Sequence, residues 1–376
     1  MISETTVQRV RELDIADVVK PYTELRRHGS EFFGLCPFHS ERTASFSVSP
    51  AKNLCYCHSC RKGGDGIQFT MEKEGLDFYG AVEFLARSHN ITIEYTRTEQ
   101  NEEQLQAAKK REALFAVLSA AHQFFTSQLR LQMDDEARAA RNYTYSRWNE
   151  EFCDTSGIGY APKDSRAFID YCKSRALPED LLFQSGLLRR SEDGRAYAMF
   201  RERVMIPIRD RIGRVVAFTG RYFGKSKKTA KYMNSINSDI FTKSDTVFGL
   251  DRASRCREAG LFNIVEGAPD VLRLQSVGIL NTVATLGTAW SDRQFEQLKK
   301  HTRSLCFIPD SDPPKEGEPY GPGFVAVMDN GKRAVQLGFD VTVRQLPADF
   351  RDVYVPLFDF EIEALEADGI RYNRPR

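Results

Sequence analysis

The chain has 376 residues, of which 41% are hydrophobic and 28% are charged, and its formal net charge is +1. This length allows two or three domains, and the near-neutral balance excludes a global field that would attract nucleic acid. No apolar run is long enough for a transmembrane helix, and the N-terminal sequence lacks a signal-peptide pattern. The sequence therefore predicts a soluble, cytoplasmic protein with no membrane partner, whose binding to a polyanion would depend on local patches.

A cysteine cluster near the N-terminus is the first strong pattern. Four of the eight cysteines fall within residues 36–60, and in a reducing compartment such a cluster indicates metal binding rather than disulfides. Cys36-Pro-Phe-His39 and Cys57-His-Ser-Cys60 offer three thiolates and one imidazole, a closed ligand set that suits structural zinc. Residues 45–49 and 54–56 alternate like strands between the two pairs, so the sequence predicts a zinc ribbon.

The surroundings of these ligands leave two alternatives open. Cys55 and His58 are competing ligands, although the spacing favours the cysteines of the second pair. Basic and aromatic residues interleave here, a composition that suits single-stranded nucleic acid because bases stack and phosphates pair with cations. The other interpretation, favoured for Phe38 and Phe46, is that the aromatic residues form the core of the ribbon. The basic residues expected to contact nucleic acid are Lys52, Arg61 and Lys62.

The N-terminal domain is predicted to close near residue 95. A short helix is expected around Val10–Val19, and Asp65 and Asp77 are expected to cap two further helices. The polar stretch 96–113 then predicts a linker, followed by an amphipathic helix over Leu114–Leu131.

A basic block follows in the middle of the chain. Phe200–Asp210 and Val215–Arg221 are β-rich runs joined by a short turn, and they predict a hairpin. On a strand, Arg201 and Arg203 would point to the same face and form a patch. Such a patch would hold a polyanion by charge-assisted contacts, whereas the competing interpretation is a solvated face without a partner.

The last part of the chain alternates apolar runs with helical patterns. Strands are predicted at Phe262–Val265, Ile279–Leu286, Leu305–Ile308 and Val341–Leu346, and helices at Ser291–Lys300 and Val325–Leu337. This order predicts a parallel sheet covered by helices, in which ligands gather at the carboxyl ends of the strands. The acids Glu266, Asp270, Asp310 and Asp312 would meet there and bind divalent cations. The alternative for any single acid is a turn residue or a helix cap.

Taken together and in this order, the motifs resemble those of the bacterial (DnaG-type) DNA primases. Cys36-Pro-Phe-His39 with Cys57-x-x-Cys60 is similar to the zinc-binding domain of that family. Phe200-Arg-Glu-Arg-Val-Met, Gly220-Arg221 and Lys231-Tyr-Met-Asn234-Ser are similar to the N-terminal part of its polymerase core, and Val265-Glu-Gly-x-x-Asp270-Val, Ala284-Thr-Leu-Gly-Thr288 and Asp310-x-Asp312 to its Toprim domain. The Toprim set alone also occurs in topoisomerases and nucleases, whereas the combination is specific.

The resemblance implies an enzyme of DNA replication, a primase that makes short RNA primers on single-stranded DNA from ribonucleoside triphosphates by two-metal nucleotidyl transfer. Glu266, Asp310 and Asp312 would hold Mg²⁺ or Mn²⁺, Asp270 would orient this catalytic cluster or share a metal, and one Zn²⁺ would be structural. The implied protein partners are a replicative helicase and a single-strand-binding protein, and a monomer is expected. By resemblance, Arg201, Arg203, Arg221, Lys231 and Asn234 line the groove for template and nucleotide.

Three features depart from the family pattern. A stretch rich in proline and glycine, 313–323, follows the second aspartate, where the family has a short turn into a helix. Asp349-Phe-Arg-Asp352 stands in place of a later Asp-Pro-Asp, so Asp352 is the candidate for a further metal ligand. The sequence printed ends at Arg376, and the resemblance implies that the family's helicase-docking domain is not expected within it, which would fit a primase of a mobile element or phage, or a truncated chain.

The expected fold is a multidomain α/β protein with a mainly parallel Toprim sheet. The expected division is a zinc ribbon at 1–95, a linker at 96–113, a mixed α+β subdomain at 114–258, a Toprim domain at 259–348 and a tail at 349–376. The alternative functions are a Toprim nuclease or topoisomerase-like strand cleaver and a non-catalytic protein that binds single-stranded DNA. The strand cleaver is disfavoured because Tyr143, Tyr145 and Tyr160 lie in no setting that marks a nucleophile.

Overall fold

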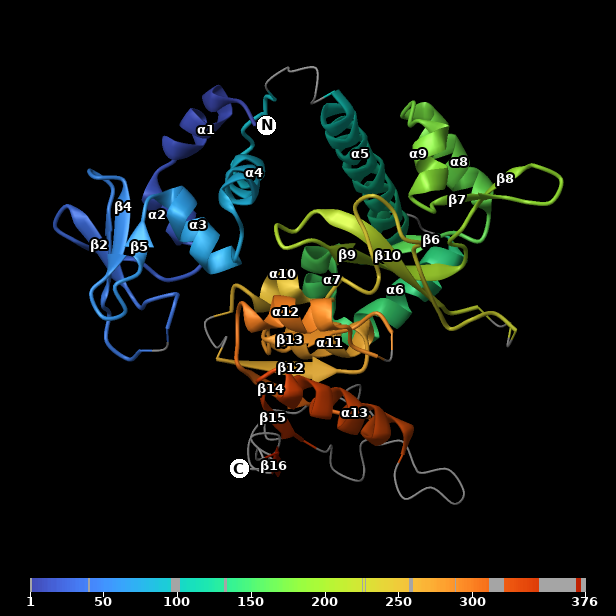
Figure 1. Cartoon of the computed structure of the whole chain (residues 1–376). Coiled ribbons are helices and arrows are strands. Elements are labelled where there is room, and N and C mark those ends of the chain that lie inside the picture. The colour runs from blue at the N-terminus through green and yellow to red at the C-terminus, as the bar shows by residue number, and fades with distance from the viewer. Residues whose placement is uncertain are drawn as a thin grey trace. The chain divides into compact units, whose positions relative to one another are not determined.

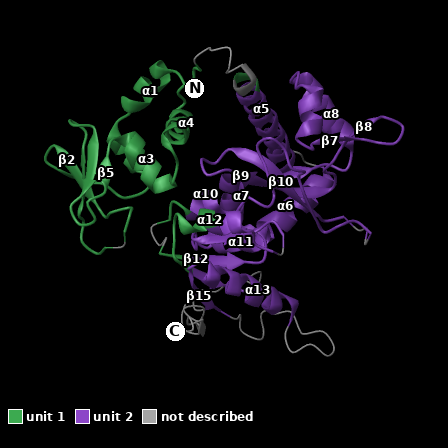
Figure 2. Cartoon of the chain, viewed as in Figure 1, with its two compact units in different colours: residues 1–106, 254–261, 296–304 green, residues 107–253, 262–295, 305–376 purple. Residues whose placement is uncertain are grey.

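The computed structural model describes residues 2–39, 41–95, 102–131, 134–224, 226, 228–256, 260–287, 289–310, 321–344 and 370–372 (Figure 1). The chain divides into two compact units (Figure 2). One comprises residues 1–106 with 254–261 and 296–304, and the other comprises residues 107–253, 262–295 and 305–376. No helix within the described ranges is long and apolar enough to cross a membrane.

The N-terminal sheet is the predicted ribbon. Its five strands follow the order β1 (Arg26–His28), β2 (Glu31–Gly34), β3 (Phe46–Ser49), β4 (Leu54–Cys57) and β5 (Gly63–Gly64), each antiparallel to its neighbour. Phe46 and Val48 of β3 are fully buried, and the Phe38 ring lies 5.3 Å from that of Phe69. The core interpretation of Phe38 and Phe46 is therefore confirmed.

Four helices accompany this sheet, α1 (Glu4–Arg11), α2 (Ile15–Val19), α3 (Gly66–Glu74) and α4 (Phe78–Ser88). Asp65 and Asp77 cap α3 and α4, as predicted, by accepting hydrogen bonds from the Gln68 and Gly80 amides. The single helix predicted over residues 10–19 was wrong. Asp14 accepts a hydrogen bond from the Ala16 amide and starts a second helix, because an extended capping residue interrupts the first.

Helix α5 (Glu102–Leu131) begins within the stretch that was predicted to be a linker. Residues 102–113 are mostly glutamate, glutamine, alanine, lysine and arginine, which are good helix formers even where no apolar face is present. The apolar part of α5, from Leu114 to Leu129, is buried in the core of the second unit. The helix prediction for residues 114–131 is thus confirmed, and the polar residues 102–113 before it are helical as well. Their role as a linker between domains stays a prediction.

The second unit contains an antiparallel four-stranded sheet in the order β11 (Tyr232–Asn234), β10 (Val215–Tyr222), β9 (Arg203–Arg209) and β6 (Gly159–Ala161). Strands β9 and β10 form the predicted hairpin. Its core includes Phe125, Phe168 and Phe218, whose rings lie within 5.4 Å of one another in two pairs. A smaller sheet of β7 (Leu188–Arg190) and β8 (Ala196–Ala198) lies beside helices α8 (Ser165–Ser174) and α9 (Glu179–Gln184) in Figure 1.

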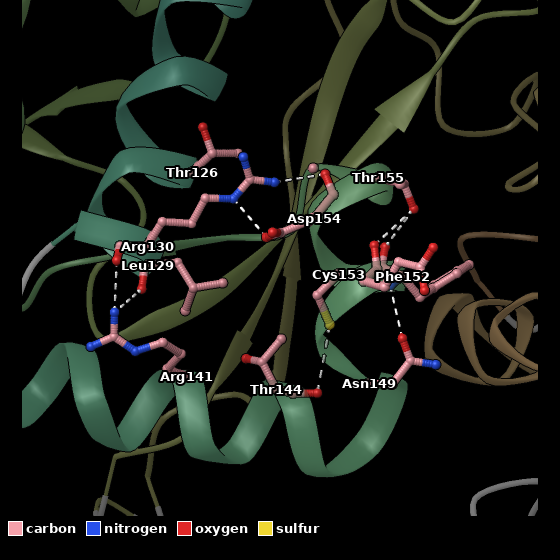
Figure 3. A network of polar contacts seen from close by, with 12 residues as sticks. Thr126, Leu129, Arg130, Arg141, Thr144, Asn149, Phe152, Cys153, Asp154 and Thr155 are labelled. Carbon is pink, nitrogen blue, oxygen red and sulfur yellow. Dashed lines mark hydrogen bonds and ion pairs between the residues drawn. The ribbon is translucent and has the colours of Figure 1, made fainter.

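A network of polar contacts fixes helices α6 (Asp135–Trp148) and α7 (Glu150–Ser156) against the end of α5 (Figure 3). Arg141 of α6 donates to the Leu129 and Arg130 carbonyls, which satisfies acceptors that a helix end leaves open. Arg130 in turn forms an ion pair with Asp154, with 2.7 Å between Nε and Oδ1. Asn149 separates the two helices with a φ of 54° and accepts a hydrogen bond from the Phe152 amide. The position of α6 matters because it carries two residues of the site described below.

The sheet in the region predicted to be a Toprim domain has the order β13 (Thr282–Ala284), β12 (Leu261–Val265), β14 (Ser304–Phe307), β15 (Asp340–Val343) and β16 (Ile370–Tyr372). β12 is parallel to β13, and β16 is antiparallel to β15. The accompanying helices are α10 (Leu250–Ala253), α11 (Ala268–Ser276), α12 (Asp292–Lys299) and α13 (Pro322–Gln336). The predicted α/β fold with a mainly parallel sheet is confirmed, although the strand expected at 279–286 is limited to its central residues.

Two hydrogen bonds join α6 to α11. The Trp148 indole donates to the Pro269 carbonyl at 3.2 Å, and Arg273 donates to the Arg147 carbonyl at 3.2 Å. Trp148 is fully buried, so the first bond is shielded from water. Helix α6 is therefore attached to the helix that follows β12.

Candidate active site

A cleft of about 460 Å³ lies where the antiparallel β11–β10–β9–β6 sheet and the mainly parallel sheet of the second unit adjoin. The residues that line it come from α6, β10, β11, the β12–α11 turn, and the ends of β13 and β14. The described residues that bear charged or amide side chains in this lining are Arg147, Lys231, Asn234, Glu266, Asp270 and Asp310. Acids and cations from distant parts of the chain therefore share one cleft.

Glu266 and Asp310 follow the neighbouring strands β12 and β14, as the parallel-sheet pattern predicts. The Asp310 amide donates a hydrogen bond to Glu266 Oε1 at 3.2 Å, so the backbone of one acid orients the side chain of the other. Glu266 is exposed and Asp310 is half-buried. Carboxylate oxygens at such a sheet edge suit Mg²⁺ or Mn²⁺, and Asp310 Oδ1 is buried in the site. The described donors therefore fit a hard divalent cation.

Asp270 has a structural contact besides its place in the cleft. It is buried in the first turn of α11, and its Oδ2 accepts a hydrogen bond from the Gly267 amide at 3.0 Å. This is the capping role that was the alternative for a single acid. Asp270 thus stabilises the turn that follows Glu266, and it lines the same cleft.

Two predicted acids, Asp312 and Asp352, lie outside the described residues, as does most of the 313–323 stretch. Within the described part of the chain, Glu266, Asp270 and Asp310 are the predicted acids that reach the cleft.

Lys231 and Asn234 lie at the ends of the short edge strand β11, and both line the cleft. Asn234 donates a hydrogen bond to the Leu286 carbonyl at 3.1 Å, which attaches β11 to the loop that follows β13. Lys231 is exposed, with its Nζ 5.8 Å from the centre of the Tyr232 ring. The structure therefore brings both predicted residues next to the acids.

The predicted Arg201–Arg203 patch was wrong. Strand β9 begins at Arg203, and Glu202 before it has a φ of 55°, so the chain is not extended between the two arginines. Arg203 is 2% exposed, and its guanidinium donates to the carbonyls of Gly220 and Lys231. Burial lowers the pKa of Arg203. Arg203 therefore supports the sheet beneath Lys231, while Arg201 alone is exposed, next to Tyr197.

Arg221 contacts a residue that the sequence analysis did not assign to the site. Its guanidinium carbon lies 4.3 Å from the centre of the Tyr143 ring, and that of Arg147 lies 4.8 Å from the same ring. Tyr232 lies near this group, and burial raises its pKa to about 12, so it stays neutral. Tyr143 and Arg147 are four residues apart on α6, a spacing that places them on one face. This four-residue spacing is the feature of the sequence from which a shared position of Tyr143 and Arg147 could have been predicted.

The first unit holds the predicted metal cluster. The ligand atoms of Cys36, His39, Cys57 and Cys60 all lie within 4.8 Å of one another. Cys36 Sγ and Cys60 Sγ are 3.7 Å apart, close to the edge of about 3.8 Å expected for a tetrahedron with Zn–S bonds of about 2.3 Å. The four residues therefore fit a structural zinc ion.

The competing ligands lie outside this cluster. Cys55 donates to the Gly64 carbonyl at 3.5 Å, and His58 Nε2 lies 3.2 Å from Ser47 Oγ. Cys57 is suited to metal binding, because hydrogen bonds from Ser45, Cys60 and Ser59 outweigh the effect of burial and lower its pKa to about 6. The thiolate that zinc requires is thus favoured at this position.

Glu41 contacts two of the predicted zinc ligands, Cys36 and His39, and orients them. Its Oε1 accepts hydrogen bonds from the Cys36 amide at 2.7 Å and the Ser45 amide at 3.2 Å. Its Oε2 lies 3.2 Å from His39 Nε2, while His39 Nδ1 lies 4.0 Å from Cys57 Sγ. This arrangement leaves Nδ1 for the metal and fixes the ring through Nε2.

We expect Glu41→Gln to weaken zinc binding about 10-fold or more, because the uncharged amide loses the charge-assisted contact to His39. The measurement is competition for zinc against a chromophoric chelator. Glu72→Gln is the matched control: it removes the partly exposed ion pair between Glu72 and Lys62, and its amide oxygen can still accept the hydrogen bond from Gln68. Equal zinc affinity in the two variants would show that Glu41 does not position His39 for the metal.

The basic residues predicted around the ribbon are all at the surface. Lys52, Arg61 and Lys62 are exposed. Lys62 lies 3.3 Å from Glu72 and 5.4 Å from the centre of the Phe38 ring. Their contact with nucleic acid stays a prediction.

Three family models match the chain in order. They are the CHC2 zinc finger at residues 2–101, the N-terminal domain of the DNA primase catalytic core at 124–254, and a Toprim-like domain at 263–353. A crystal structure of the zinc-binding and RNA polymerase domains of the Aquifex aeolicus primase is 30% identical with a TM-score of 0.64, and the match covers 98% of this chain and 86% of that chain. The chain belongs to the bacterial DNA primase family.

Other primases give the same result. Curated DNA primases of Staphylococcus aureus (strain COL) and Pseudomonas putida (strain KT2440) are 31% and 36% identical, over 92% and 81% of this chain. These matches cover 56% and 46% of the relatives, so the chain spans about half the length of the curated primases that it matches. A DnaG primase catalytic domain bound to single-stranded DNA is 27% identical with a TM-score of 0.60, over 70% of this chain and 83% of that chain.

The primase models place the two sides of the cleft in different regions. Lys231 and Asn234 fall in the primase core match, and Glu266 and Asp310 fall in the Toprim match. The cleft therefore joins the two primase regions within one compact unit.

Proposed function

We propose that this chain is a template-directed primase, which joins ribonucleotides into short RNA primers on single-stranded DNA during replication. The observation that carries the proposal is the composition of one cleft. Glu266 and Asp310, which suit divalent cations, share it with Lys231 and Arg147, which suit phosphates. Membership of the primase family supports the same reaction.

The acids of the cleft would hold Mg²⁺ or Mn²⁺, with Asp312 as the proposed partner of Glu266 and Asp310. When bound, two such ions would activate the primer 3′-hydroxyl and neutralise the charge that develops on the triphosphate. Asp270 would keep the turn after β12 in place through its bond to Gly267. Asp352 stays a proposed additional ligand.

The cations of the cleft would bind the polyanions. In each addition the primer 3′-oxygen bonds to the α-phosphorus of the incoming ribonucleotide, and the bond from that phosphorus to pyrophosphate breaks. Lys231 and Arg147 would draw the triphosphate toward the acids. Arg221, held against Tyr143, would contact the template backbone, and Asn234 would keep β11 beside the nucleotide.

The proposed template is single-stranded DNA, which is the ligand named for one of the similar primase structures. The exposed residues Arg201, Lys52, Arg61 and Lys62 would add contacts to its phosphates. A replicative helicase and a single-strand-binding protein are proposed as partners on the family resemblance alone.

A primer-synthesis assay tests the proposal. The chain is incubated with ribonucleotides, Mg²⁺ or Mn²⁺, and single-stranded templates that together contain every trinucleotide. We expect short RNA products whose start sites share a sequence preference. Nicked or shortened template without RNA would replace this proposal with the strand-cleaving alternative, and the absence of both reactions would favour a non-catalytic binding protein.

A further inference from the structure

Gly323, the second residue of α13, lies directly against the proposed metal-binding acids. A Cβ atom at this position would overlap Glu266 Oε1, and would lie 3.3 Å from Glu266 Cδ and 3.2 Å from the Asp310 carbonyl oxygen. Gly323 is buried, although the carboxylate beside it reaches solvent. The first turn of α13 therefore packs directly against the Glu266 side chain.

The backbone conformation does not explain a glycine here. Gly323 is a helical residue of α13, and its φ lies outside the left-handed range that favours glycine. Alanine is the better helix former at such a position. The feature that a side chain would change is the space that the Glu266 carboxylate occupies.

We propose that Gly323 is a positioning residue for catalysis: its missing side chain lets the Glu266 carboxylate lie between α13 and the Asp310 backbone. In that place Glu266 Oε1 accepts the hydrogen bond from the Asp310 amide, so the two acids are held together. A methyl group at residue 323 would move the carboxylate away and break this arrangement. The proposal rests on the proposed function in one respect, namely that Glu266 binds the divalent ion.

The displacement costs little folding energy, since Glu266 is exposed and its carboxylate is the mobile end of the side chain. Gly323→Ala is therefore expected to fold and to lose metal affinity. The same helix offers a matched control. At Gly331, also buried in α13, an added Cβ would meet Val341 Cγ1 at 3.7 Å, an ordinary contact.

The test is Mn²⁺ binding to the full chain, measured by electron paramagnetic resonance, with circular dichroism and thermal melting as checks of folding. Gly323→Ala is expected to weaken Mn²⁺ binding about 10- to 100-fold, while Gly331→Ala binds as the unchanged chain does. In a Glu266→Gln background, where the remaining acids bind Mn²⁺ weakly, Gly323→Ala is expected to cause no further loss.

Three outcomes would overturn the inference. Unchanged Mn²⁺ affinity in a folded Gly323→Ala variant would show that the carboxylate is not displaced. An equal loss in the Glu266→Gln background, or an equal loss in Gly331→Ala, would show that the effect does not act through Glu266. A Glu266→Gln variant that binds Mn²⁺ as tightly as the unchanged chain would instead reject the proposed role of Glu266, which is a separate failure.

Discussion

Glu266→Gln is expected to abolish RNA synthesis, with a loss of about 1,000-fold or more, which corresponds to about 4 kcal/mol of transition-state stabilisation. Glutamine has the same shape and can still accept the hydrogen bond from the Asp310 amide. It lacks the negative charge that is proposed to hold a divalent ion against the triphosphate. Single-stranded DNA binding is expected to persist, because the proposed template contacts are cations elsewhere. The measurements are the initial rate of primer synthesis and the fluorescence anisotropy of a labelled oligonucleotide.

A second acid of the Toprim region provides the control for this experiment. Asp292 is exposed and pairs with Arg333 at 2.7 Å, a surface contact of small energetic value. Asp292→Asn removes one negative charge without touching the cleft, and its synthesis rate is expected to stay within about 2-fold of the original. Synthesis that survives in Glu266→Gln would move the catalytic metal away from this acid.

Cys57→Ser is expected to remove zinc and to unfold the ribbon. Cys57 is fully buried, and its thiolate is one of the four ligands that close the cluster. Structural zinc contributes about 10 kcal/mol or more to the fold of a small domain, which is comparable to the whole stability of such a domain. Zinc content by atomic emission should fall from one ion per chain to none, and amide hydrogen exchange should accelerate across residues 26–64.

The same strand supplies the matched variant. Cys55 is two residues away on β4 and equally buried, but its thiol bonds to the Gly64 carbonyl and lies outside the ligand cluster. Cys55→Ser is therefore expected to keep its zinc. If Cys57→Ser retained stoichiometric zinc, then Cys55 or His58 would have to replace the lost ligand, and Cys57 would no longer be assigned as a necessary zinc ligand.

The parts of the fold that were predictable from the sequence are those with a strong local signal. Strand β12 is an apolar run buried on both faces, and the paired Cys-x-x motifs require a tight metal cluster whatever the rest of the chain does. Each of these patterns is set by a few consecutive residues. The acids after β12 and β14 were predictable for a similar reason, because parallel strands bring their carboxyl ends to one edge.

The remaining features depend on contacts that no short stretch of sequence encodes. Arg203 appeared to be a surface cation, yet Gly220 and Lys231 offer it carbonyl partners across the sheet, and the turn at Glu202 separates it from Arg201. Arg147 reaches the cleft because α6 packs on a helix more than a hundred residues away in the chain. Its four-residue spacing from Tyr143 was visible, but the destination of that helix face was not.

The attachment of α6 to α11 has a mechanical consequence. Arg147 lies on α6, and α11 begins just after Glu266. The hydrogen bonds of Trp148 and Arg273 join these two helices, so they connect the element that carries the cation to the element next to the acid. A motion that separates them must break both bonds, each worth about 1 kcal/mol, and must expose a buried indole. These contacts oppose a change in the distance between Arg147 and Glu266. Under the proposed function, a primer–template duplex in the cleft would then move past this side without requiring it to open.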